Sequence, residues 1–275
     1  MGKLTEYAAV KRFDSGDILI KDGKNGTKKI DVKDAAREFA GLVSASQHRI
    51  IWGGRNLGST VTDAQKAAIK NGTFDDLYIG DYWTIENVTW RIWDMDYFIN
   101  CGDTSLNTHH LVIVPDSSLY NHIMNDTNTT EGGYVGSKMY KEGLEQAKTA
   151  FKAAFGDLIL THRDYLTNAV TDGHASAGAW FDSEVELMNE IMVYGTHMYA
   201  AMGTGAMVPN KYTTGKQQFA APMLNPSIVN RRGWFWLRDV VSSAGFAYVS
   251  DSGSADSHGA SHSIGVRPYA LIGVK

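Results

Sequence analysis

A group of chemically reactive residue types lies between positions 101 and 110. Such residues bind transition metals or pair a thiol nucleophile with a base, and the interval contains Cys101, Asp103, His109 and His110. Successive side chains of a strand point to opposite faces, so His109 and His110 cannot readily bind one ion together. No local signature brings a base to Cys101. We therefore interpret these residues as packing and hydrogen-bonding groups.

Two further sets of ionisable residues also have a structural interpretation. Asp94 and Asp96 stand two positions apart on an apparent strand, which would place both carboxylates on one face, where they could bind a cation. No EF-hand loop accompanies them, and a turn or a solvated edge explains them equally well. His162 is followed by Arg163 and Asp164, for which we expect a local hydrogen bond or ion pair.

Sequence motifs for catalysis and cofactor binding are missing. The chain contains no Walker motif, no Gly-x-Gly-x-x-Gly and no Gly-x-Ser-x-Gly. A single cysteine excludes an internal disulfide framework and a site built from several thiolates. We predict that the protein is not an enzyme, that it has no catalytic residue, and that it binds no metal or cofactor.

The C-terminal segment has the composition of a binding surface. Residues 240–274 include no Lys, Glu, Gln, Trp or Met and are rich in Ser, Gly and Asp. Tyr, Ser, Gly and Asp on a rigid scaffold form adaptable binding surfaces, although a polar loop rich in turns has a similar composition. We predict that the ligand-binding residues are Tyr248, Ser250, Asp251, Ser252, Ser254, Asp256, Ser257, His258, His262 and Ser263.

A second set of residues in the same region is interpreted as scaffold. An arginine within an aromatic, strand-rich segment usually binds buried backbone carbonyls or a carboxylate, and Asp239 is one candidate partner. The predicted structural residues are Trp236, Arg238, Gly265, Arg267 and Pro268.

Composition limits the protein class. The chain has 275 residues, is 43% hydrophobic and carries a net charge of −4, so it can bury a core and is unlike a basic nucleic-acid-binding protein. No apolar run approaches the length of a membrane span, and the first ten residues lack the apolar core of a secretory signal. We expect neither a nucleic-acid partner nor membrane insertion, and folding in a reducing cytoplasm.

Periodicity and turn residues predict an α+β fold. Apolar residues at helical spacing, with Thr62 as an N-cap and a Ser183–Glu186 capping box, predict helices over 34–46, 63–71, 138–155 and 183–194. Aromatic and β-branched runs bounded by turn residues predict strands. These strands cover 17–20 and 28–32, joined as a hairpin, and 77–83, 88–93, 111–114, 234–237, 246–249 and 269–274.

Several of these stretches resemble the C-type-lectin-like domains of bacteriophage and prophage proteins. The resemblance rests on Trp234-Phe235-Trp236-Leu237-Arg238, on Phe246-Ala247-Tyr248-Val249 and on the closing Gly265-Val266-Arg267-Pro268, with residues 77–93 and 178–195 matching upstream. Residues 15–17 and 26–30 are similar to particle-attachment segments of phage fibre proteins. The calcium signatures of animal lectins and the paired cysteines of formylglycine-generating enzymes are absent, so neither activity carries over.

The resemblance implies a virion protein, assembled in the bacterial cytoplasm, that is a head or tail fibre or a decoration component. A C-type-lectin-like domain over 77–275 would bind a host-surface protein or glycan through its C-terminal face. It would follow a linker with a short helix over 51–76 and a segment over 1–50 that attaches to other virion proteins or oligomerises. We expect a homotrimer.

Some members of this family are diversified by retroelements that mutate adenines. Asn codons ending in a pyrimidine cannot then yield Lys, Glu, Gln, Trp or Met, which agrees with the composition of residues 240–274. The alternative function is an enzyme or metal-dependent hydrolase on a formylglycine-generating-enzyme-like fold. It would use His109, His110 or the pair Asp94 and Asp96.

Overall fold

A computed structural model describes residues 18–23, 26–31, 45–200 and 217–275. The chain divides into two compact units, Met1–Ser44 and Ala45–Lys275. The predicted boundaries at 50 and 76 therefore have no counterpart in this division, because the predicted linker belongs to the second unit. Over the described part of the chain, no helix combines the length and apolar character that a transmembrane helix requires.

The first unit contains the predicted hairpin. Strands β1 (Ile18–Gly23) and β2 (Gly26–Asp31) pair antiparallel, from Ile18 opposite Asp31 to Gly23 opposite Gly26. The predicted helix over 34–46 lies outside the described residues except for its last two positions. These two residues begin α2 (Ala45–His48), which belongs to the second unit.

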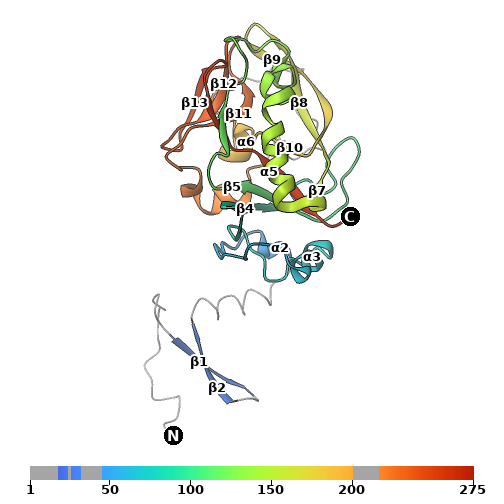
Figure 1. Cartoon of the computed structure of the whole chain (residues 1–275), viewed down its shortest axis with the longest axis vertical. Coiled ribbons are helices and arrows are strands. Elements are labelled where there is room, and N and C mark those ends of the chain that lie inside the picture. Colours follow the sequence, from blue (N-terminus) through green and yellow to red (C-terminus); the bar gives the residue numbers. More distant parts are fainter. Residues whose placement is uncertain (1–17, 24–25, 32–44, 201–216) are drawn as a thin grey trace. The chain divides into compact units, whose positions relative to one another are not determined.

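The second unit is a mixed α+β structure built on two main sheets (Figure 1), as the sequence predicts. The first sheet has the order β10-β15-β5-β4-β3, and β7 also pairs with β15. Its strands are β3 (Tyr82–Ile85), β4 (Val88–Met95), β5 (His110–Pro115), β7 (Ile159–Leu160), β10 (Val185–Glu186) and β15 (Tyr269–Gly273). The strands predicted at 88–93, 111–114 and 269–274 are confirmed.

The second sheet has the order β13-β12-β11-β14-β6 and carries the C-terminal segment. All of its pairings are antiparallel except that of β11 with β14. A separate hairpin of β8 (His162–Thr171) and β9 (His174–Ser183) was not predicted. The strands of the sheet are β6 (Tyr120–His122), β11 (Phe235–Val240), β12 (Gly245–Val249), β13 (Ala255–Gly259) and β14 (Ile264–Val266).

Two predicted helices are confirmed. Helix α3 (Asp63–Lys70) begins with the capping box of Thr62 and Gln65, in which each side chain binds the backbone N–H of the other. Helix α5 (Glu145–Phe155) covers most of the range 138–155, but its expected first turn is a separate π-helical turn, η2 (Met139–Gly143). Phe151 and Phe155 of α5 are buried and contact Trp90 of the first sheet.

The helix predicted over 183–194 is wrong in its first half. Ser183 ends β9, and Glu186 lies in β10, opposite Tyr269. The Ser183 hydroxyl donates to the Glu186 carboxylate over 3.1 Å, so the capping-box pair makes a side-chain contact in the core instead of capping a helix. The helix begins only after Asn189, whose side chain accepts a hydrogen bond from the Met192 N–H.

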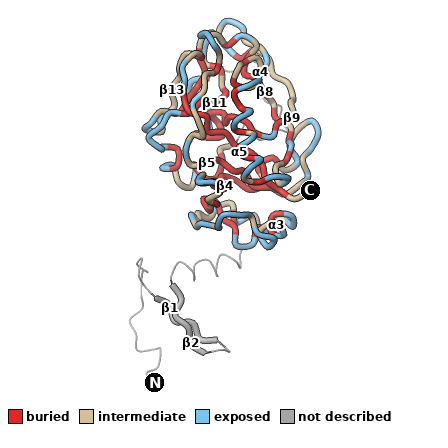
Figure 2. The backbone as a smooth tube through the Cα atoms, in the orientation of Figure 1, coloured by how far each residue is buried: buried red, intermediate tan, exposed pale blue. Residues whose placement is uncertain are grey.

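The remaining helical segments are short, and the core forms two apolar clusters. The short segments are α4 (Gly133–Gly136), η3 (Gly156–Leu158), α6 (Glu190–Tyr194), α7 (Ala220–Leu224) and η5 (Pro226–Ile228). Strands β4, β5 and β11 are mostly buried (Figure 2). One cluster contains Trp90, Phe151 and Phe235, and the other contains Trp236 and Phe246. The two faces of β11 therefore pack on different clusters, because Phe235 and Trp236 point to opposite sides.

Candidate functional site

Strands β12 and β13 place part of the predicted ligand-binding set on one face of the second sheet. Tyr248 is opposite Asp256, and Phe246 is opposite His258. Because directly opposed residues point to the same side of a sheet, Tyr248, Asp256 and His258 share a face. The Tyr248 hydroxyl donates to the Asp256 carboxylate over 3.2 Å.

The aromatic rings of this face form a contact cluster with an exposed member that the sequence did not predict. Trp234 is 44% exposed, and its ring centroid lies 5.2 Å from that of Tyr248 and 6.0 Å from that of His258. The His258 and His262 rings are 3.8 Å apart. We call Trp234, Tyr248, His258 and His262 the aromatic cluster.

Tyr248 lies beneath this surface instead of projecting from it. It is only 5% exposed, and burial, followed by the charge of Asp256, raises the pKa of Tyr248 to about 12. Tyr248 therefore packs into the core beneath this face. The exposed aromatic group of this cluster is Trp234, which in the sequence begins an aromatic run directly after the charged Arg231 and Arg232 and the small Gly233.

Three of the predicted serines, Ser250, Ser252 and Ser254, lie in the turn between β12 and β13. The Ser250 and Ser252 hydroxyls lie 2.9 Å apart, and those of Ser252 and Ser254 lie 3.2 Å apart. The Ser254 N–H donates to the Ser250 hydroxyl, and Gly253 has a φ of 83°, which its missing side chain permits. The exposed members of the predicted set are Asp251, Ser252, Ser254, His262 and Ser263, whereas Ser250, Asp256, Ser257 and His258 are half-buried.

Burial lowers the pKa of His258, and the neighbouring His262 lowers it further. Two histidine rings in contact cannot both be charged without repulsion. His258 therefore favours its neutral state, and the two imidazole rings offer ring faces and hydrogen-bonding nitrogens to a ligand. Asp251 and Asp256 give this face its negative charge.

Arg238 is buried and paired with a carboxylate, but its partner is not the predicted one. It donates to both oxygens of Asp164 over 2.6 and 3.0 Å, and both residues are buried. The Tyr269 hydroxyl also donates to Asp164, over 2.6 Å. The prediction of Asp239 as partner is wrong, because Asp239 accepts a hydrogen bond from the Glu190 N–H. Asp164 lies on β8, in the hairpin that the sequence did not predict.

The other predicted scaffold residues are also buried. The Trp236 indole N–H donates to the His122 carbonyl over 2.9 Å. At Gly265 a Cβ would lie 2.2 Å from the Ser118 hydroxyl oxygen and 2.4 Å from the Trp234 carbonyl oxygen, so only glycine fits. Arg267 donates to the carbonyls of Pro115 and Ile228 over 2.8 and 3.1 Å. Pro268 is buried next to it.

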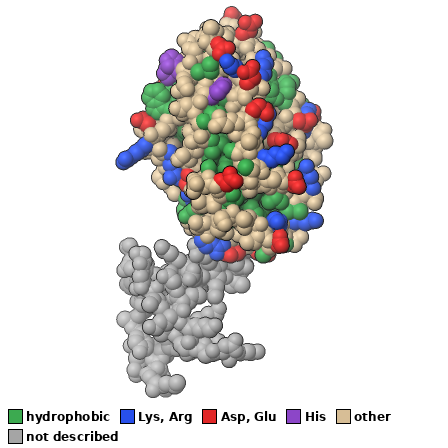
Figure 3. All heavy atoms as spheres, viewed as in Figure 1, with side chains coloured by type: hydrophobic (Ala, Val, Ile, Leu, Met, Phe, Trp, Pro, Cys, Tyr) green, Lys and Arg blue, Asp and Glu red, His purple; other side chains and the backbone are tan. Residues whose placement is uncertain are grey.

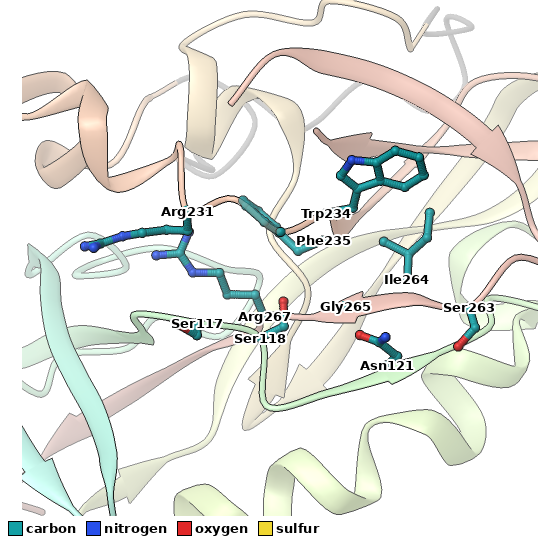
Figure 4. Close-up of a pocket in the computed structure, with 11 residues that line it drawn as sticks. Ser117, Ser118, Asn121, Arg231, Trp234, Phe235, Ser263, Ile264, Gly265 and Arg267 are labelled. Carbon is teal, nitrogen blue, oxygen red and sulfur yellow. The ribbon is translucent and has the colours of Figure 1, made fainter. Parts of the chain in front are cut away.

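A cavity of about 420 Å³ lies beside the aromatic cluster and shares Trp234 with it. In Figure 4, Arg231 and Arg267 lie at one end of the group of lining residues, and Trp234, Ile264 and Ser263 lie at the other. The cavity is lined by Ser117, Ser118, Asn121, Arg231, Gly233, Trp234, Phe235, Ser263, Ile264, Gly265 and Arg267. We call it the Arg267 cavity. Of the predicted ligand-binding residues, only Ser263 lines it.

The histidines between 101 and 110 have structural partners. His110 is buried; its Nδ1 lies 2.9 Å from the Thr108 carbonyl, and its Nε2 accepts a hydrogen bond from the Phe98 N–H. Burial lowers its pKa. His109 Nδ1 contacts Asp96 at 2.7 Å. Cys101 is buried, as the packing interpretation predicts.

The expectation that Asp94 and Asp96 share one face of a strand is wrong. Asp94 is buried in β4 and binds Arg49 and the Ala220 N–H, whereas Asp96 follows the strand in a left-handed conformation, with a φ of 53°. Their carboxylates therefore point to different partners. Within residues 45–200 and 217–275, no group of three or more metal-ligating side chains is found.

The residues around His162 also make structural contacts, and only some of these are with neighbours in the sequence. His162 Nε2 lies 3.9 Å from Asp164 and 3.4 Å from the Tyr269 hydroxyl, and burial lowers the pKa of His162 to about 4. Arg163 instead forms ion pairs with Asp103 and Asp182.

Comparisons with known proteins identify no relative. No family model matches the chain, and neither the curated proteins nor the solved structures contain a match.

Proposed function

We propose that this protein is a bacteriophage virion component, a head or tail fibre or decoration protein, that displays a C-type-lectin-like ligand-binding domain. The family resemblance of residues 77–93, 178–195 and 234–268 supports the virion role and the finer fold. The observed α+β architecture is compatible with that fold. The ligand would be a protein or glycan of the host surface.

The observation that carries the binding role is the exposed Trp234 ring, held against Tyr248 and His258 beside a turn of serine hydroxyls. An indole ring exposed on a rigid sheet provides a large contact area at low entropic cost, and sugar rings and protein side chains both pack on it. Hydroxyl and imidazole groups around it supply donors and acceptors. Small polar side chains can also be exchanged without loss of core packing, as retroelement diversification would require.

The buried framework below supports this role. The Arg238–Asp164 pair and the carbonyl contacts of Arg267 hold β11, β14 and their neighbours in place independently of the exposed side chains. Binding residues are often positioned in this way, on loops held by a rigid scaffold. Acidic and basic side chains are mixed on the face that Figure 3 shows, so this face carries no single sign of charge.

The N-terminal unit would attach the domain to the particle. It is a compact unit separate from Ala45–Lys275, and its described part is a two-stranded hairpin. A single hairpin is marginally stable alone, so contact with other copies or other virion proteins would complete it. A homotrimer would multiply the affinity of each head for a cell surface.

The alternative of a metal-dependent hydrolase has less support. Both ring nitrogens of His110 contact backbone groups, and Asp94 is buried against Arg49. These groups would have to abandon structural contacts in order to act on a substrate.

The experiment compares binding of the full chain to a panel of bacterial cells with binding of Trp234→Ala and of the triple variant Trp234→Ala, Asp251→Ala, His262→Ala. These side chains are exposed, so we expect unchanged thermal melting and at least tenfold weaker attachment. Met223→Ala, which truncates another exposed apolar side chain (52% exposed), is the control. Full attachment by the triple variant would refute the proposed binding surface.

A further inference from the structure

Arg267 is a fully buried cation without a carboxylate partner in direct contact. Its guanidinium donates to two backbone carbonyls, and its Nη2 has no hydrogen-bond partner among the described residues. Burial lowers the pKa of Arg267 to about 9, so the group still carries its charge at pH 7. The guanidinium also lies 4.9 and 5.0 Å from the centres of the Trp93 and Phe235 rings, which offset part of the cost of burying its charge. Neither ring satisfies Nη2 or neutralises the charge, so this arrangement favours an anion nearby.

The surroundings of Arg267 carry an excess of positive charge. Asp116 is the acidic residue that acts on Arg267, but its carboxylate already binds Arg91 through two hydrogen bonds and lies 3.5 Å from Arg231. Three guanidinium groups therefore share one carboxylate. No aspartate or glutamate lines the Arg267 cavity, whereas Arg231 and Arg267 both do. Low-dielectric walls around such a site strengthen its attraction for anions.

The other lining residues suit an anion that is attached to a ring. Ser117, Ser118 and Asn121 supply hydroxyl and amide donors, which are the neutral groups that bind carboxylate and phosphate oxygens. Trp234, at the opposite end in Figure 4, offers an exposed aromatic face. The volume of about 420 Å³ lies within the range of small-ligand sites.

We propose that the Arg267 cavity binds the anionic group of an acidic saccharide, a carboxylate or phosphate carried on a sugar ring, with the ring against Trp234. Arg231 and the serine hydroxyls contact the oxygens, and Arg267 supplies a fixed positive charge in the wall. This inference rests on the proposed function, because it names the class of ligand for the same C-terminal face.

The test measures binding of glucuronate, glucose 6-phosphate and glucose to the full chain by titration calorimetry at constant ionic strength. The two acidic sugars distinguish a carboxylate ligand from a phosphate ligand, and glucose lacks the charge. We expect at least one acidic sugar to bind at least tenfold more tightly than glucose. Equal affinity for all three sugars, or no binding at all, would overturn the assignment.

Two variants locate the site without removing the buried Arg267. Arg231→Gln should weaken binding of the acidic sugar on the order of tenfold, the effect of losing one hydrogen bond to a charged group. Arg232→Gln removes the same charge from the neighbouring exposed residue, which does not line the cavity, and should leave the affinity unchanged. Equal losses of affinity in the two variants would show that the acidic sugar is attracted by overall charge, and would overturn the assignment of the Arg267 cavity as its site.

The outcome is separable from that of the proposed function. If the acidic sugars do not bind while Trp234→Ala abolishes attachment to cells, the binding surface stands and the cavity assignment falls. If the acidic sugars bind and Arg231→Gln weakens their binding, but the Trp234 variants attach to cells normally, the cavity assignment stands. The proposed role of the aromatic cluster in host attachment is then refuted.

Discussion

Glu186 is a buried carboxyl whose ionisation should destabilise the fold. It is 3% exposed, and it accepts hydrogen bonds from the Tyr134 and Ser183 hydroxyls over 2.8 and 3.1 Å. The guanidinium of Arg238 binds Asp164 instead. Burial, followed by the negative charge of Asp164, raises the pKa of Glu186 to about 7, and Arg238 only partly opposes this.

The direction of the pH effect follows from the number of protons that Glu186 binds in the folded and unfolded chains. Between pH 4.5 and about 7 the folded chain keeps a proton on Glu186 that the unfolded chain has lost, so this group's contribution to stability falls as the pH rises through that window. The whole difference amounts to about 3 kcal/mol. The pKa of buried His162 is lowered to about 4, so its contribution rises between about pH 4 and 6.5 and partly hides that of Glu186.

Glu186→Gln isolates the effect because His162 is present in both proteins. The amide stays neutral, and the Tyr134 and Ser183 hydroxyls can reorient toward it. Chemical denaturation at several pH values should show the free energy of unfolding of the variant rising relative to wild type by about 2–3 kcal/mol between pH 5 and pH 8. A constant offset between the two proteins across this range would refute the reasoning.

The control for this measurement is Glu184→Gln. Glu184 is exposed, two positions before Glu186, and accepts a hydrogen bond from the Thr161 hydroxyl. Its substitution removes the same charge from the surface, so the difference from wild type should change little with pH. A pH trend as large as that of Glu186→Gln would assign the effect to overall charge.

Three further outcomes follow from the buried contacts. Arg267→Ala removes the guanidinium donor from the Pro115 carbonyl and leaves the Ile228 carbonyl with its longer hydrogen bond from Arg231 alone, and calorimetry should show the Tm falling by roughly 5–10 °C; an unchanged Tm would contradict the scaffold role. Gly265→Ala forces a Cβ against backbone and should cost about 1–3 kcal/mol in denaturation experiments, whereas wild-type stability would show that the backbone yields there. Deletion of residues 1–44 should leave a folded unit that no longer self-associates, as measured by light scattering. Deletion of residues 1–50 also removes Arg49 from buried Asp94, so it should lower the free energy of unfolding by about 3 kcal/mol more. Equal stability of the two truncated chains, or self-association of the chain that lacks residues 1–44, would count against these expectations.

Local pattern in the sequence was sufficient for several elements. The helix α3 follows from Thr62 as its N-cap, and the helix α5 from apolar residues at helical spacing that end at Gly156. Runs of aromatic and β-branched residues predicted β4, β5, β11, β12 and β15. In each case the residues that determine the element lie within one or two turns or one strand of each other, so a short window contains the information.

The same kind of reasoning failed where a local signal competed with a distant partner. Ser183 and Glu186 have the spacing of a capping box, but pairing of β10 with β15 places them in the core. In the hairpin β8–β9, burial alternates only over the first half of β8, and β9 is rich in Ala, Ser and Gly, so local propensity does not distinguish the hairpin from a loop. Tertiary contacts decided both cases.

For the candidate site, the sequence indicated that Arg238 and Arg267 are buried and which segment is polar, because an arginine among aromatic residues needs buried acceptors and small polar side chains bury little. It did not indicate that Tyr248 is buried. The tertiary structure alone determined the partners and the exposure. Arg238 pairs with Asp164, 74 positions away, and the Arg267 cavity combines residues 117–121, 231–235 and 263–267. Trp234 is exposed while the adjacent Phe235 is buried, because Trp234 precedes β11 whereas Phe235 begins the strand and packs into the apolar core. Such long-range contacts depend on how the sheets pack, and no short stretch of sequence encodes that packing.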